Sequence, residues 1–262
     1  MQDTQNQPDT RGIAIDKVGV KNLRFPLRIR DRDHAEQSTV AVVSLAVDLP
    51  HHFKGTHMSR FVEVLHAHGS VLNVADIAGM PQELLQRLHA EKAHVEFKFP
   101  YFRRKKAPVT GAEGLLDYGV IFEVNASKEE VDFAVTVEVP VTTLCPCSKA
   151  ISARGAHNQR GNVTLAVRFT TPVWVEDLIE LVEASASSEL FSVLKRPDEK
   201  AVTETAYDNP VFVEDLVRNV AARLKVHPHI TWFKVEAENY ESIHNHNAWA
   251  VVEGDNRKTA DA

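Results

Sequence analysis

The chain contains little cysteine: among its 262 residues only Cys145 and Cys147 carry thiols, and one proline separates them. Two cysteines this close cannot form a disulfide without severe strain, and a single pair does not make a disulfide framework. The composition therefore favours a reduced, cytoplasmic protein with free thiols.

Long apolar runs and an excess of positive charge are also missing. No stretch of 18 apolar residues occurs, so we expect no membrane-spanning helix. The net charge is −6, whereas general nucleic-acid binding requires a basic face. Residues 1–12 are polar and lack the apolar centre of a signal peptide, which predicts a disordered tail. Neither a membrane nor a nucleic acid is expected as a partner.

What the sequence does contain is hydrophobic periodicity, which predicts the same order of elements in each half: two strands, two helices and two strands. Strands are expected over residues 15–31, 38–50, 93–102, 114–127, 133–144 and 162–171, with two more inside 230–255. Helices are expected over residues 59–69, 81–90, 174–187 and 212–228. This order is typical of an α+β fold, in which two units of antiparallel β-sheet each carry two helices on one face.

The same pattern predicts where the chain divides. We expect a first unit over 13–128, a second unit over 129–255 with most of the functional site, and a C-terminal tail over 256–262. The basic run at 103–106 is expected to be a solvated turn, and 195–210 a linking segment. Open sheet edges favour pairing between subunits.

Reactive side chains concentrate between residues 142 and 161. On an extended chain the sulfurs of Cys145 and Cys147 point the same way, so both can face one pocket. Lys149 favours the thiolate, which is the form that binds metal or attacks. His157 lies in a glycine-flanked loop and suits a metal ligand or a general acid. The alternative is two buried thiols that pack as small hydrophobes, beside a surface histidine.

A second segment presents His244 and His246, which share one face if the segment is a strand. Glu241 falls on the opposite face unless a bulge or turn intervenes. The alternative is a solvated turn. Further carboxylate candidates are Asp198, Glu199, Glu204, Glu214 and Asp215, although carboxylates that begin a helix usually serve its cap and dipole.

Basic candidates lie in the first half. Lys54, His57 and Arg60 flank a helix start expected at Ser59, a geometry suited to phosphate. A thiolate, imidazoles and a carboxylate together describe a catalytic divalent-metal site. Zinc suits the sulfur ligand, and manganese or iron suits a site in which carboxylate and imidazole predominate. Such a site supports metal-assisted hydrolysis without identifying the substrate.

Five segments in this order resemble the type IB GTP cyclohydrolase I family of bacteria and archaea. They are FKGTHMSRF (53–61), LCPCSK (144–149), GAHNQRG (155–161), AYDNPVFVED (206–215) and ESIHNHNAWA (241–250). The resemblance implies a bimodular tunnel fold that assembles as a homotetramer, with active sites at subunit interfaces. It implies a hydrolase acting on cyclic amidine C–N bonds: GTP and water give 7,8-dihydroneopterin triphosphate and formate, the first step of folate biosynthesis.

The resemblance also implies roles for particular residues. Cys147 matches the metal-linked, catalytically important thiol, with Cys145 beside it. The positions that match those around the metal are His157, Glu199, His244 and His246, joined in some metal states by Glu241. Glu214 resembles the acid that anchors the purine, because a carboxylate accepts two parallel hydrogen bonds from guanine N–H groups. The candidates for the triphosphate are Lys54, His57, Arg60 and Arg160.

The implied chemistry needs proton transfers but no organic cofactor. The candidate acid that protonates N7 of the guanine as the ring opens is a histidine, most simply His157 or a partner that does not bind the metal. Two other interpretations stay open. A tunnel-fold nitrile reductase would also use a pocket cysteine and an anchoring glutamate, but it needs a nicotinamide cofactor and a lysine-rich signature that we do not find. A non-catalytic metal- or nucleotide-binding protein would hold its metal in a closed site of four protein ligands.

Overall fold

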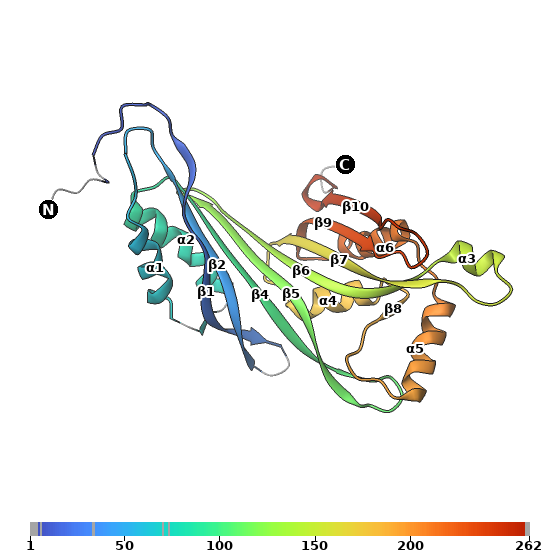
Figure 1. The fold of residues 1–262 in the computed structure, drawn as a ribbon. Helices are drawn as coiled ribbons and strands as arrows, with labels where there is room; N and C mark the ends of the chain where they lie inside the picture. The colour runs from blue at the N-terminus through green and yellow to red at the C-terminus, as the bar shows by residue number, and fades with distance from the viewer. Residues whose placement is uncertain (1–4, 6, 33–34, 70, 73, 260–262) are drawn as a thin grey trace. The chain divides into compact units, whose positions relative to one another are not determined.

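A computed structural model describes residues 5, 7–32, 35–69, 71–72 and 74–259 (Figure 1). The chain forms two compact units. The first comprises the residues up to Pro100 together with Ile121–Val135, and the second comprises Tyr101–Val120 together with the residues from Thr136 onward. Three strands, β4 (Lys92–Lys106), β5 (Glu113–Ser127) and β6 (Val131–Leu144), therefore contribute a segment to each unit. The boundary at residue 128 stays a prediction.

The first unit is an antiparallel sheet with two helices on one face. Its elements are β1 (Ile15–Asp31), β2 (Ala35–Leu49), α1 (Met58–Ala67), β3 (Val71–Leu72), α2 (Val74–Leu88), β4 (Lys92–Lys106) and β5 (Glu113–Ser127). The strand order is β3-β1-β2-β4, and only the short β3 runs parallel to its neighbour β1. Alternate residues such as Leu27 and Leu45 are buried, and α1 adds Phe61 and Leu65 to the same core.

Both helices of this unit begin earlier than the sequence predicts. Helix α1 starts at Met58, and its N-cap is His57, without a side-chain capping bond, rather than Ser59. Helix α2 starts at Val74 and contains Pro81 in its interior. The apolar stripe predicted over 81–90 covers the C-terminal half of α2, and Pro81, a residue type common at helix starts, lies inside this helix.

The second unit repeats the arrangement with additional helices. Its elements are β6 (Val131–Leu144), α3 (Pro146–Ile151), β7 (Asn158–Phe169), α4 (Val175–Glu183), β8 (Ser188–Glu189), α5 (Arg196–Asp208), α6 (Val213–Lys225), β9 (Ile230–Asn239), β10 (Ala248–Asp255) and the 3₁₀ turn η1 (Asn256–Thr259). The strand order is β6-β7-β9-β10, and β8 pairs with β6. Helix α6 packs on β9 and β10, and this contact buries its residues Leu216, Val220 and Leu224 against the sheet. Helix α4 packs on β7. The predicted α+β class is confirmed.

Helix α5 occupies the segment expected to link two elements. Only Asp198 and Ala206 of this helix are buried, so it has no apolar stripe that periodicity could detect. Asp198 holds its start instead, because its carboxylate accepts hydrogen bonds from the Lys195 amide at 2.8 Å and the Thr110 hydroxyl at 2.6 Å. The expectation of a linking segment was therefore wrong.

The basic run at 103–106 is strand, not turn. These residues end β4, and the reversal follows at 107–112, where Gly111 has a left-handed φ of 68°. Two of the four side chains pair with α4: Arg103 lies 2.7 Å from Glu180, and Lys105 lies 2.7 Å from Glu183. Local charge suggested solvent exposure, but the partners come from more than seventy residues away.

Some residues of the predicted tails pair with the body of the chain. The backbone N–H groups of Lys54 and Gly55 donate to Gln7 and Gln5, each at 3.1 Å. At the other end, the amide of Asn256 donates to the carbonyls of Leu224 and Ile230. Among the described helices, none is both long and apolar enough to cross a membrane.

Candidate functional site

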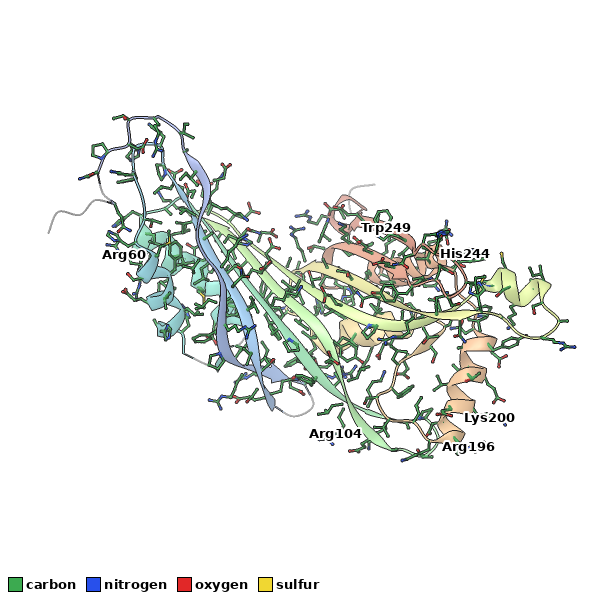
Figure 2. All side chains as sticks on the ribbon, viewed as in Figure 1. Arg60, Arg104, Arg196, Lys200, His244 and Trp249 are labelled. Carbon is green, nitrogen blue, oxygen red and sulfur yellow. The ribbon has the colours of Figure 1, made fainter. Side chains whose placement is uncertain are left out.

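A pocket of about 280 Å³ in the second unit gathers several of the predicted residues. Cys145 and His157 reach it from the connection between β6 and β7, and Glu214 reaches it from the first turn of α6. Glu241, His244 and His246 line it from the loop between β9 and β10, on which Figure 2 shows His244. Segments about ninety residues apart thus supply one cavity with a thiol, imidazoles and carboxylates.

Backbone and hydroxyl hydrogen bonds hold Cys145 and His157 together. The Cys145 N–H donates to the His157 carbonyl at 3.1 Å. The Ser148 hydroxyl donates to the Cys145 carbonyl at 3.1 Å and accepts from the His157 N–H at 3.2 Å. The spacing between thiol and imidazole is therefore set by the main chain and one serine, independently of either side chain.

The two cysteines occupy different environments. Pro146 begins the short helix α3, and Cys145 is its N-cap, whose sulfur accepts a hydrogen bond from the Ser148 N–H at 3.4 Å. Cys147 is exposed on that helix and does not line the pocket. The prediction that both sulfurs point the same way on an extended chain is wrong, because proline suits the first position of a helix. The role predicted for Cys147 stays a prediction, and the pocket favours Cys145 for it.

The ring of His157 is oriented by a buried amide. Its Nδ1 lies 2.9 Å from Oε1 of Gln159, and Nε2 of Gln159 donates to the Thr143 hydroxyl at 2.8 Å. Gln159 and Thr143 are both buried. The other ring nitrogen of His157, Nε2, makes no hydrogen bond within the described part of the chain, and it is the atom left for chemistry.

His244 and His246 lie in a loop rather than on a strand, since β9 ends at Asn239 and β10 begins at Ala248. Their rings nevertheless stack, with centroids 5.1 Å apart and an angle of 16° between planes. Both side chains are exposed. The turn also brings Glu241 to the pocket, which an ideal strand would have pointed away.

Glu214 and Asp215 both lie in the first turn of α6, but one of them faces the pocket and the other caps the helix. Asp215 acts as the cap, because its carboxylate accepts a hydrogen bond from the Phe212 N–H at 3.4 Å. The side chain of Glu214 makes no hydrogen bond to any described residue, and it lines the pocket. Its carboxylate is therefore available to a ligand, and the capping role considered for it belongs to its neighbour.

Several predicted residues lie elsewhere. Glu199 is exposed on α5, next to Asp198, and does not line this pocket. Lys54, His57 and Arg60 belong to the first unit, where Lys54 donates to Gln7 at 3.3 Å and Arg60 donates to the Arg87 carbonyl at 3.1 Å. Arg160 is exposed on β7. Their predicted roles stay predictions.

A second, larger pocket of about 380 Å³ in the same unit is lined by carboxylates that are already paired with basic side chains. Its carboxylates include Glu183, which accepts hydrogen bonds from Lys105 and Tyr118, both at 2.7 Å. Burial first, and then the charge of Glu183, raise the pKa of Tyr118 well above its ordinary value, so the phenol stays protonated. These groups stabilise the fold, whereas the smaller pocket contains side chains, such as that of Glu214, that are available to a ligand.

The smaller pocket matches a divalent cation in the chemistry of its donors. Thiolate, imidazole and carboxylate are the ligands that zinc, manganese and iron prefer. Within the residues that the structure describes, however, no three His, Cys, Asp or Glu side chains are arranged to hold one ion. The match is therefore one of donor type, without a convergent geometry.

Two polar residues of the pocket were not predicted. Gln159 follows His157 by two positions, the spacing at which residues of an extended chain share a side, so strand alternation could have identified it. Asn239 is 3% exposed, and its Oδ1 has no hydrogen-bond partner among the described residues. A Cβ at Gly161, its cross-strand neighbour, would lie 2.6 Å from that oxygen, so any larger residue there would displace the Asn239 amide. No pattern in the sequence marks Asn239.

The fold places this chain among tunnel-fold proteins. It is similar to a uricase from Bacillus fastidious, with a TM-score of 0.56 and 8% identity over 97% of this chain and 96% of that one. The uricase from Arthrobacter globiformis gives a TM-score of 0.52 and 10% identity, covering 91% and 92%. At such identities the similarity shows the fold alone.

The family is shown by sequence. Residues 1–250 match the model of type I GTP cyclohydrolase folE2, and the chain belongs to that family. A relative named GTP cyclohydrolase FolE2 from Akkermansia muciniphila is 65% identical over 260 residues, covering 98% of each chain. A protein of the same name from Methylococcus capsulatus is 57% identical, covering 99% of this chain and 97% of its own.

Proposed function

We propose that this chain is a GTP cyclohydrolase I, a hydrolase that converts GTP and water to 7,8-dihydroneopterin triphosphate and formate at the start of folate biosynthesis. Membership of the folE2 family supports the reaction. The observation that carries the proposal is the pocket that combines Cys145 and His157 with the uncommitted carboxylate of Glu214. The finer assignment to type IB rests on the motif resemblance.

Glu214 is the proposed anchor for guanine. Its carboxylate has no protein partner among the described residues and faces the cavity from the start of α6. The 2-amino group and ring N–H of guanine present two parallel donors, which a carboxylate accepts together. This contact would orient the ring and leave C8 and N7 toward the other residues of the pocket.

The remaining pocket residues are proposed to hold a divalent cation, Zn²⁺, Mn²⁺ or Fe²⁺. The proposed ligands are His157, His244, His246 and Glu241, with Cys145 or Cys147 as the thiolate and Glu199 from α5. A bound cation would act as a Lewis acid and lower the pKa of water. Two roles are open for His157, cation ligand and proton carrier to N7, and both use Nε2 because Gln159 occupies Nδ1.

The triphosphate is proposed to contact Lys54, His57 and Arg60, with Arg160 as a further candidate. The first three belong to the first unit, whereas the pocket belongs to the second. We propose that a homotetramer in the cytoplasm brings the two sets together, with the first unit of one copy completing the pocket of another. Strand β10 lies at the edge of the second unit's sheet, and an edge strand that can pair between subunits supports this arrangement.

One assay tests the reaction. Purified protein is stripped of metal, reloaded with Mn²⁺ or Zn²⁺ and supplied with GTP. We expect release of formate and, after oxidation, a fluorescent pterin, and both signals should disappear with a chelator. Tight metal binding without formate under any metal would contradict the proposal.

A further inference from the structure

The amide of Gln159 connects the pocket to the interior of the second unit. Gln159 is 7% exposed and Thr143 is fully buried. Their contacts form a short chain: the Thr143 hydroxyl accepts from Nε2 of Gln159 at 2.8 Å, and Oε1 of Gln159 lies 2.9 Å from Nδ1 of His157. A buried amide with both ends engaged cannot be rotated freely, so it holds the imidazole in one orientation.

The orientation of this amide determines where the proton of His157 resides. The carbonyl oxygen of an amide only accepts and its NH₂ group only donates. In the structure Nε2 of Gln159 lies on the Thr143 hydroxyl and Oε1 faces the imidazole, so a hydrogen bond between Oε1 and Nδ1 requires the hydrogen on Nδ1. A neutral imidazole has one N–H, so Nε2 of His157 is then unprotonated.

We infer that Gln159, held by Thr143, is a positioning residue that keeps His157 in the Nδ1–H tautomer and presents an unprotonated Nε2 to the pocket. In this tautomer Nε2 can bind a cation or accept a proton, but it cannot donate one. A proton for N7 therefore has to reach His157 first or come from another group. Only the consequence for the protonation of N7 rests on the proposed function, and the tautomer of His157 does not.

The inference also predicts an effect on cation binding. A ligating histidine whose second ring nitrogen donates to a fixed acceptor is held in position and made more basic. Loss of such a partner typically weakens metal binding about 10- to 100-fold. Gln159→Leu removes the acceptor, whereas Gln159→Glu keeps an oxygen beside Nδ1. The neighbouring Asn158 is exposed, so Asn158→Ala is a matched control.

The first experiment measures the tautomer directly. Metal-free protein labelled with ¹⁵N-histidine is studied by NMR at about pH 8, where an ordinary imidazole is neutral, and the His157 signals are assigned by their loss in His157→Gln. We expect protonated Nδ1 and unprotonated Nε2 in the native protein, in Gln159→Glu and in Asn158→Ala. Gln159→Leu should lose this preference. A native protein with its proton on Nε2 would overturn the inference, since the amide would then be oriented the other way.

The second experiment titrates the same proteins with Co²⁺ alone and follows the absorption spectrum. Gln159→Leu should bind about 10- to 100-fold more weakly, while Gln159→Glu and Asn158→Ala stay close to the native affinity. Unchanged tautomer and affinity in Gln159→Leu would overturn the inference. If that variant does not fold, Thr143→Val replaces it, because it removes the hydrogen-bond partner at the other end of the amide. Neither measurement uses GTP, so absence of formate release would contradict the proposed reaction and leave the tautomer result standing.

Discussion

Two thiols separated by one residue differ in what they can reach. Cys145 lines the pocket as the N-cap of α3, and Cys147 is exposed on the same helix. We expect Cys145→Ala to lower formate release about 100-fold or more, the scale of losing a group that acts on reacting atoms. Cys147→Ala should keep most of the activity. Equal thermal stability of the variants is the control, and the reverse pattern of activities would assign the role to Cys147.

Glu214 and Asp215 allow a similar comparison between neighbours. Glu214→Gln removes the charge from two proposed hydrogen bonds to guanine, a loss of about 3 kcal/mol that corresponds to about 100-fold in kcat/KM. Asp215→Asn changes the cap of α6 instead, so it should affect stability more than kcat/KM. Steady-state kinetics with GTP measure both. Native kcat/KM in Glu214→Gln would remove Glu214 from the substrate site.

At the scale of elements, β4 is joined to α4 through buried charge. The side chains of Lys105 and Glu183 are 9% and 8% exposed, and their N and O atoms lie 2.7 Å apart. Removing one member of a buried pair leaves an uncompensated charge, so Lys105→Ala should lower the free energy of unfolding by about 3 kcal/mol. Lys106, whose side chain is 73% exposed, is the matched control. Lys106→Ala should change the free energy of unfolding by less than about 0.5 kcal/mol. Urea denaturation measures both, and equal effects would show that the pair adds little.

Helix α5 depends on a single carboxylate for its position. Burial by itself would raise the pKa of Asp198, but hydrogen bonds from Thr110, Lys195 and Val109 outweigh it and hold that pKa well below its ordinary value. Asp198→Ala would leave those donors without an acceptor, and we expect the thermal midpoint to fall by several degrees. Glu204→Ala, on the exposed side of the same helix, is the control. An unchanged midpoint in Asp198→Ala would contradict the capping role.

At the scale of the whole molecule, the proposed site combines the first unit of one copy with the second unit of another. The double variant Lys54→Ala/Arg60→Ala and the single variant Glu214→Gln should each be nearly inactive. Equal amounts of the two variants are unfolded together and reassembled. Half of the copies then carry a native first unit and the other half a native second unit, so about one quarter of the sites would combine two native units. Formate release should therefore recover to about a quarter of the native rate. No recovery in tetramers that mass measurement shows to be mixed would contradict shared sites.

The order of strands and helices could be predicted from the sequence because it depends on local apolar periodicity. The alternation in β7 and the stripe of α6 can be read without knowing what they pack against. The exceptions had no such signal. Helix α5 lacks an apolar face, and the pairing of Arg103 and Lys105 with α4 depends on residues distant in the chain.

The sequence by itself determined the fold class, the family and the kinds of side chain at the candidate site, since these depend on residue type and spacing. Only the tertiary structure decided which cysteine meets His157, that Glu214 is free while Asp215 caps, and that Gln159 and Asn239 belong to the pocket. The physical reason is that the pocket forms where β7 pairs with β9 and where α3 and α6 begin. Those contacts join segments up to about ninety residues apart, and no local pattern encodes which of two neighbouring side chains will face the cavity.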